Sequence, residues 1–127
     1  MSAIGFEFDI LIKGERTQAL DVFTAANPDW KCRCGKNGGM LAEPPQLTVD
    51  QPEACAFVAL HVDAYATQLS ALRVLGHGHC VRIAVHFDSA TMTALSLGLK
   101  PSTMALVSAL GYQVEFCLYP STEHDDD

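Results

Sequence analysis

Apolar and polar side chains alternate near both ends of the chain. In the first segment the two sets are Phe6, Phe8, Ile10 and Ile12 against Glu7, Asp9 and Lys13. In the last segment they are Tyr112, Val114, Phe116 and Leu118 against Gln113, Glu115, Cys117 and Tyr119. A period of two is typical of a strand with one buried face. Each segment therefore predicts a strand, and Pro120 is expected to close the second.

The middle of the chain predicts further strands. Residues 54–62, ACAFVALHV, are apolar in both alternating sets, which favours a central strand buried on two sides, with His61 in the set opposite Val58 and Val62. Residues 80–87, CVRIAVHF, predict a strand with Arg82 and His86 on its non-core side. A short strand is also expected within residues 93–99. Residues 27–47 hold many Pro and Gly residues and predict a long loop with one short strand.

Helical spacing and end signals predict three helices. The first spans residues 15–26 and stops at Asn27, before Pro28. The second begins after Asp63 and ends at Gly76. The third begins at Pro101, presents Met104, Val107 and Leu110 to the core, and ends at Gly111.

These elements indicate an α+β fold. A strand, a helix ending in Gly and a second strand occur at residues 54–87 and again at 93–119, which suggests a weak internal βαβ-like duplication. We expect a mixed or antiparallel sheet of about four to six strands, with about three helices packed on one face. Residues 1–120 are interpreted as a single domain and residues 121–127 as a disordered acidic tail.

Composition and charge narrow the classes of partner. The chain has 127 residues, 49% of them hydrophobic, and a net charge of −7 with eight Lys and Arg residues. This charge argues against nucleic-acid and anionic-membrane binding, which need clustered basic residues, and suits a basic partner. The apolar runs are too short to span a membrane, and the start of the chain lacks the basic region of a signal peptide, so a cytoplasmic location is expected. Five cysteines, an odd number, indicate reduced thiols.

The order of elements and several residues resemble a known family. The chain is similar to the bacterial family called domain of unknown function 4279, whose opening strand and helix lead to a proline and a glycine that Pro28 and Gly38 or Gly39 match. The family's closing helix and strand are matched by Gly98, Leu99, Leu110, Gly111, Val114, Phe116, Leu118 and Tyr119. The resemblance implies no catalytic activity. It implies an immunity protein encoded beside a secreted bacterial toxin.

Cysteine and histidine pairs raise the alternative of a metal or small-molecule site. Cys32 and Cys34 lie in the predicted loop, and His77 and His79 lie at a helix-to-strand turn, so the four together offer the ligands that zinc prefers. One residue separates each pair, which is shorter than usual zinc-loop spacing, and we expect no bound metal or other cofactor. Cys34, beside Arg33, is the candidate nucleophile, but no base is fixed near it in sequence and we expect no enzymatic activity.

The non-core face of the sheet is the favoured functional surface. Alternation directs a set of polar side chains away from the core, and Trp30, expected to be exposed in the loop, offers an aromatic anchor. The predicted partner-binding residues are Glu7, Asp9, Trp30, His61, Arg82, His86 and Glu115. The sequence thus favours a non-catalytic immunity protein that binds a cognate protein toxin, and the acidic net charge suits a basic one. The oligomeric state is open.

Overall fold

A five-stranded mixed sheet organises the chain. The structure is a computed structural model that describes residues 4–14, 17–35, 38–49, 53–92 and 94–121. The strands are β1 (Ile4–Lys13), β2 (Lys31–Cys34), β3 (Gly39–Glu43), β4 (His77–Asp88) and β5 (Gln113–Ser121). Their order in the sheet is β2-β3-β1-β4-β5. Only the β4–β5 pair is parallel among the pairs of this sheet, and the helix between these two strands makes the crossover that such a pair needs.

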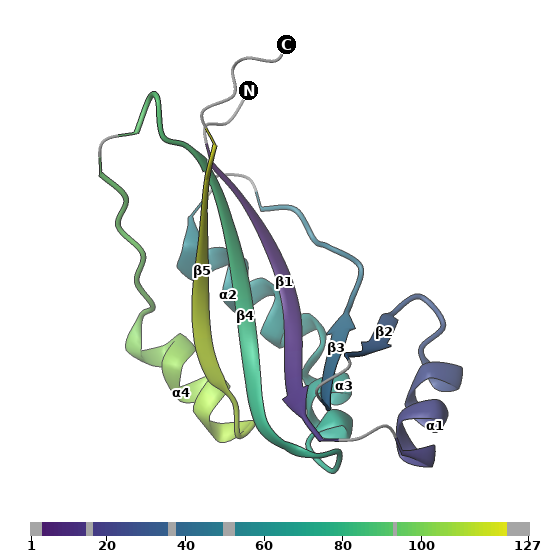
Figure 1. The fold of residues 1–127 in the computed structure, drawn as a ribbon. Helices are drawn as coiled ribbons and strands as arrows, with labels where there is room; N and C mark the ends of the chain where they lie inside the picture. The colour runs from purple at the N-terminus through teal and green to yellow at the C-terminus, as the bar shows by residue number, and fades with distance from the viewer. Residues whose placement is uncertain (1–3, 15–16, 36–37, 50–52, 93, 122–127) are drawn as a thin grey trace.

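Four helices of the described chain cover one side of the sheet. They are α1 (Gln18–Ala26), α2 (Ala54–Ala64), α3 (Ala66–Leu72) and α4 (Pro101–Ala109). In Figure 1, α2 and α3 lie behind β1 and β4, and the near face of these strands carries no helix. The core confirms this layering, because the alternate residues that face the helices are buried: Phe8, Ile10, Ile12, Val81, Ile83 and Val85. The predicted α+β class and the one-sided helical layer are confirmed.

The segment predicted as a central strand is instead helix α2. Its buried residues are Ala54, Cys55, Phe57, Val58, His61 and Val62, a spacing that belongs to a helix. Glu53 starts this helix, since its carboxylate accepts hydrogen bonds from the backbone N–H groups of Cys55 (3.2 Å) and Ala56 (2.8 Å). The prediction failed because an apolar run without clear periodicity fits a buried helix as well as a buried strand.

The expected duplication is wrong for the same reason. Residues 54–87 begin with a helix, and residues 94–100 are extended but belong to no strand. Leu95, Leu97 and Leu99 still pack against the core, so their alternation reflects burial without sheet pairing. The β4-α4-β5 unit is the part of the pattern that the structure contains.

Other boundaries also differ from the sequence expectations. The predicted loop at 27–47 contains two strands, β2 and β3, which pair with each other. Val107 of α4 is buried as predicted, but Met104 is 49% exposed and Thr103 is buried in its place. β5 continues through Pro120 to Ser121, and the rest of the predicted tail, residues 122–127, lies outside the described residues. No described helix has the length and apolarity needed to cross a membrane.

Gly76 makes the turn from α3 to β4 possible. Its φ of +53° lies in the left-handed region, and a Cβ there would collide with the carbonyl oxygen of Lys13. The turn brings β4 back alongside β1, where Lys13 pairs with His77 and Phe8 with Ile83. This pairing positions the polar side chains of the two strands on the uncovered face.

Candidate functional site

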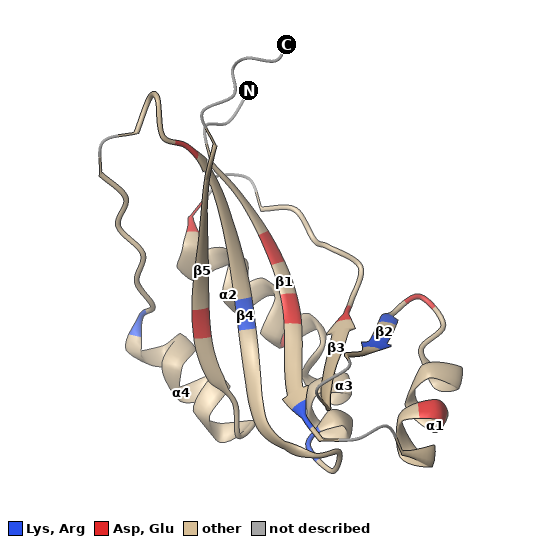
Figure 2. Cartoon of the chain, viewed as in Figure 1, with Lys and Arg blue, Asp and Glu red and all other residues tan. Residues whose placement is uncertain are grey.

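The uncovered sheet face brings together polar side chains from β1, β4 and β5. Asp9 of β1 pairs with Arg82 of β4, which pairs with Glu115 of β5, so the three side chains form a row across the sheet. Glu7 lies two residues from Asp9 along β1, and His86 lies four residues from Arg82 along β4. Figure 2 shows acidic positions on β1 and β5 on either side of a basic position on β4. We call the face made by Glu7, Asp9, Arg82, Ala84, His86, Glu115, Cys117 and Tyr119 the open face.

Arg82 and Asp9 form the central ion pair of the open face. The Arg82 Nε donates to Asp9 Oδ1 at 3.0 Å, and a second guanidinium nitrogen donates to Oδ2 at 3.4 Å. Hydrogen bonding to Asp9 raises the pKa of Arg82. The two side chains are 27% and 14% exposed, so water screens the pair less than it screens a fully exposed one. Asp9 is therefore a partnered group and not a free surface charge.

His86 is held on two sides by its neighbours. Its Nε2 lies 3.0 Å from Glu7 Oε1, and its ring stacks on Tyr119 with centroids 5.2 Å apart and planes 19° apart. The three groups remain substantially exposed, and Tyr119 is 48% exposed. Tyr119 is absent from the predicted partner-binding residues, although the alternation in β5 places it on the same face as Glu115 and Cys117.

A small depression lies at the centre of the open face. Its volume is about 150 Å³, and its lining residues are Glu7, Asp9, Arg82, Ala84, His86, Cys117 and Tyr119. Burial raises the pKa of the Cys117 thiol, and the nearby Glu115 carboxylate raises it further. A raised pKa disfavours the thiolate, which is the nucleophilic form. The depression thus offers hydrogen bonding and charge, while its thiol is poorly suited to attack.

His61 does not belong to the open face, contrary to the prediction. It lies on α2, is 0% exposed, and stacks on Phe8 with ring centroids 4.8 Å apart. Its Nδ1 lies 2.8 Å from the carbonyl oxygen of Phe57, and its Nε2 accepts the Leu47 N–H at 2.9 Å. Both ring nitrogens have partners, so His61 is a core histidine.

Trp30 is buried as well, so the exposure predicted for it is wrong. It is 3% exposed and makes edge-to-face contacts with Phe23 and Tyr65, each at a centroid distance of 5.3 Å. It therefore joins α1 to the start of α3 and cannot anchor a partner from this position. A single tryptophan among polar loop residues gave no sequence signal for this packing.

The four candidate zinc ligands do not converge. Cys32 and Cys34 lie on β2 and His77 and His79 on β4, with β3 and β1 between these strands. Three strand spacings amount to about 14 Å, well beyond a shared coordination sphere. His79 is also occupied, since its Nε2 lies 2.6 Å from the Leu75 carbonyl oxygen and its Nδ1 lies 2.6 Å from an Arg73 nitrogen. In the described part of the chain, no cluster of three or more His, Cys, Asp or Glu residues is arranged to hold a metal.

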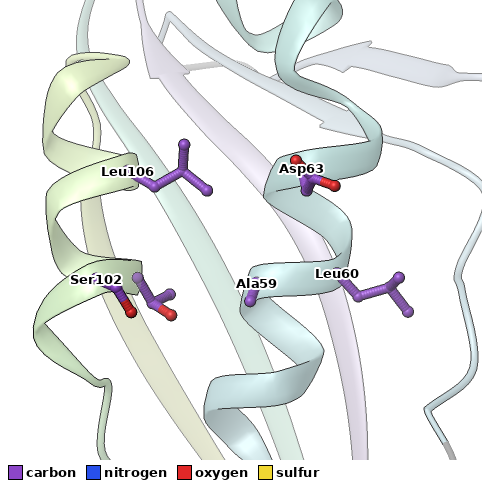
Figure 3. A pocket seen from close by; sticks show the side chains of 6 residues that line it. Ala59, Leu60, Asp63, Ser102 and Leu106 are labelled. Carbon is purple, nitrogen blue, oxygen red and sulfur yellow. The ribbon is translucent and has the colours of Figure 1, made fainter.

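The helical side carries a second concavity. A shallow groove of about 410 Å³ runs between α2 and α4 and is lined by Ala59, Leu60, Asp63, Ser102, Thr103 and Leu106. Figure 3 shows Leu106 and Ser102 on α4 facing Ala59 and Asp63 on α2. Leu60 and Leu106 are 38% and 36% exposed. The groove is largely apolar, with Asp63 as its ionisable group.

Comparison with protein-family models, curated proteins and solved structures finds no match for this chain. The resemblance to the domain of unknown function 4279 family therefore stays a prediction from sequence.

Proposed function

We propose that this protein is a non-catalytic interaction protein that binds a protein partner through the open face. The main support for this proposal is that the sheet face without helices holds charged side chains that contact one another. These contacts are the Asp9–Arg82 pair and the His86–Glu7 pair. Side chains that are ordered before binding lose less conformational entropy when a partner docks. Such a surface is suited to recognition.

The charge of the open face favours a basic partner. Asp9 is balanced by Arg82, while Glu7 and Glu115 add negative charge when histidine is counted as neutral. Complementary charge across an interface raises the association rate and excludes wrong partners. Tyr119, stacked on His86 and half exposed, supplies the aromatic contact predicted for Trp30.

The family resemblance supports a specific form of this proposal, in which the partner is a toxin encoded next to the gene and binding neutralises it. The test is growth of a host that expresses the toxic domain together with each variant. Glu7→Lys should weaken binding on the order of tenfold, mainly by slowing association, and should reduce protection. Tyr119→Ala should shorten the lifetime of the complex.

Asp63→Lys is the matched control, because it makes the same charge change on the helical side, where Asp63 lines the groove between α2 and α4. It should leave protection intact. Thermal melts of all variants establish that they are folded. If folded Glu7→Lys and Tyr119→Ala proteins both protect fully, the open face is not the binding surface.

A further inference from the structure

We propose that β5 forms a symmetric dimer with β5 of a second copy, by antiparallel pairing about a two-fold axis at Phe116. β5 is the last strand of the sheet, and within the described residues no strand pairs with its outer edge. A long edge with free N–H and C=O groups is a template for another strand. This proposal is independent of the function of the open face.

The other edges of the sheet are blocked or short. β2 has four residues, with exposed Lys31 and Arg33 side chains that discourage strand addition. β1 pairs with β3 only from Ile10 to Lys13. Beyond this, the Gln46 side chain bonds the Phe8 N–H (2.7 Å) and the Phe8 carbonyl (2.9 Å), as a neighbouring strand would. The nine-residue β5 is the longest edge left for pairing in the described sheet.

Alternation along β5 shows which backbone groups face outward. The Ser121 carbonyl accepts a hydrogen bond from Ser89 N–H at 2.9 Å and so points toward β4. Successive residues of a strand direct their backbone groups to opposite edges, so Val114, Phe116, Leu118 and Pro120 direct theirs outward. Pro120 thus lies where its missing N–H removes no bond to β4, the position in which an edge strand tolerates proline.

The position of Pro120 selects the register. With the axis at Phe116, Val114 lies opposite Leu118 of the second copy, and each outward N–H of Val114, Phe116 and Leu118 meets an outward carbonyl. Pro120 then lies opposite Tyr112, which precedes the start of β5 at Gln113, so the missing N–H of Pro120 falls beyond the paired part of the strand. Shifting the axis by one residue to Cys117 places Pro120 opposite Val114 and leaves the Val114 carbonyl without a donor.

The side chains are compatible with this self-pairing. On the helical side, Val114 and Phe116 are half-buried, while Leu118 is 52% exposed because α4 lies beside the first part of β5. The two-fold axis places the exposed Leu118 of one copy beside the first part of β5 in the second copy, where α4 lies. On the open face, Glu115 lies opposite Cys117 of the second copy, so like charges are not directly opposed.

The first test is molar mass by analytical ultracentrifugation from micromolar to millimolar protein. We expect twice 13.7 kDa at high concentration. Leu118→Lys should raise the dimer dissociation constant by at least on the order of tenfold, because a charged edge residue opposes strand pairing. Val74→Lys, which alters an apolar side chain 81% exposed after α3, is the matched control and should leave it unchanged.

A disulfide test reports the register. Glu115→Cys places the new thiol opposite Cys117 of the second copy in a non-hydrogen-bonded pair, where the Cα atoms are about 4.5 Å apart. Mild oxidation should then give a covalent dimer, and Glu115→Cys with Cys117→Ser should not. A wild-type chain that crosslinks through its own Cys117 would contradict the Phe116 register.

Salt separates this proposal from the proposed function. Self-pairing brings together two chains of net charge −7, so added salt should strengthen the dimer, whereas it should weaken binding of a basic partner to the open face. A protein that stays monomeric up to millimolar concentration, or a dimer unaffected by Leu118→Lys, overturns the edge proposal and leaves the open-face proposal standing.

Discussion

His61 shows how one buried side chain links stability to pH. Its ring is enclosed by Phe8 and Phe57, and both nitrogens are used, with Nε2 accepting the Leu47 N–H. That acceptor role requires the neutral ring. Burial accordingly lowers the pKa of His61 below its usual value of about 6.5, and the backbone bond to Phe57 opposes this only in part.

We expect the free energy of unfolding to decrease as the pH falls below about 6.5. In that range the unfolded chain binds a proton at His61 that the folded chain excludes, so the loss is up to about 1.4 kcal/mol per pH unit until the folded pKa is reached. Urea unfolding at intervals of about half a pH unit between pH 7 and pH 5 gives the dependence of the unfolding free energy on pH, and His61→Gln should make that dependence less steep. The exposed His86→Gln is the control. An unchanged slope in His61→Gln would contradict the account.

Trp30 and His61 also show what single residues did not reveal in the sequence. Both were assigned to a surface, and both are buried, because their burial depends on Tyr65 and Phe8, which reach them only after the chain folds. By contrast, Arg82, His86 and Glu115 lie on regular strands, and alternation alone put them on the correct face. Local periodicity is visible in sequence, whereas tertiary contacts of loop residues are not.

At the scale of elements, the periodicity of apolar residues predicts the strands β1, β4 and β5. The Pro and Gly residues near the helix ends predict where α1 and α4 end. Helix α2 could not be predicted in this way, because apolar residues lie on all sides of it and their pattern favours neither the helical nor the strand period. Glu53 caps this helix in the structure, but Glu is not among the residues that usually do so, and the start of α2 therefore carries no clear sequence signal. The sequence predicts one short strand in residues 27–47, whereas the structure has two, β2 and β3, because the Gly and Pro residues around them obscure the pattern of such short strands.

Glu53 gives a direct test of the start of α2. Glu53→Ala removes the acceptor of two backbone N–H groups and should destabilise the fold by about 1 kcal/mol, within the range for N-cap losses. Glu53→Asp, which keeps a carboxylate, should recover part of this loss. Denaturant unfolding measures both variants, and equal stability of Glu53→Ala and wild type would show that the cap is dispensable.

At the scale of the whole molecule, the one-sided helical layer is what makes the open face available. Four described helices cover the buried face, and Ala54, Phe57 and Val62 of α2 contribute to that packing. The opposite face keeps its charges because Asp9 and Arg82 neutralise each other across the two central strands. The sheet thus separates the packed side, which stabilises the fold, from the side that we propose binds the partner.

Native cysteines provide the most direct measurement of the central claim, that the open face binds the partner. Cys117 lines the depression of the open face, whereas Cys32 of β2 pairs with the buried Ala42 and packs against the core on the helical side. The rates of alkylation at both thiols are measured by mass spectrometry with and without the proposed partner, a toxin domain. We predict that bound partner slows the alkylation of Cys117 by at least on the order of tenfold and leaves that of Cys32 unchanged. An unchanged rate at Cys117 under saturating partner would contradict the account.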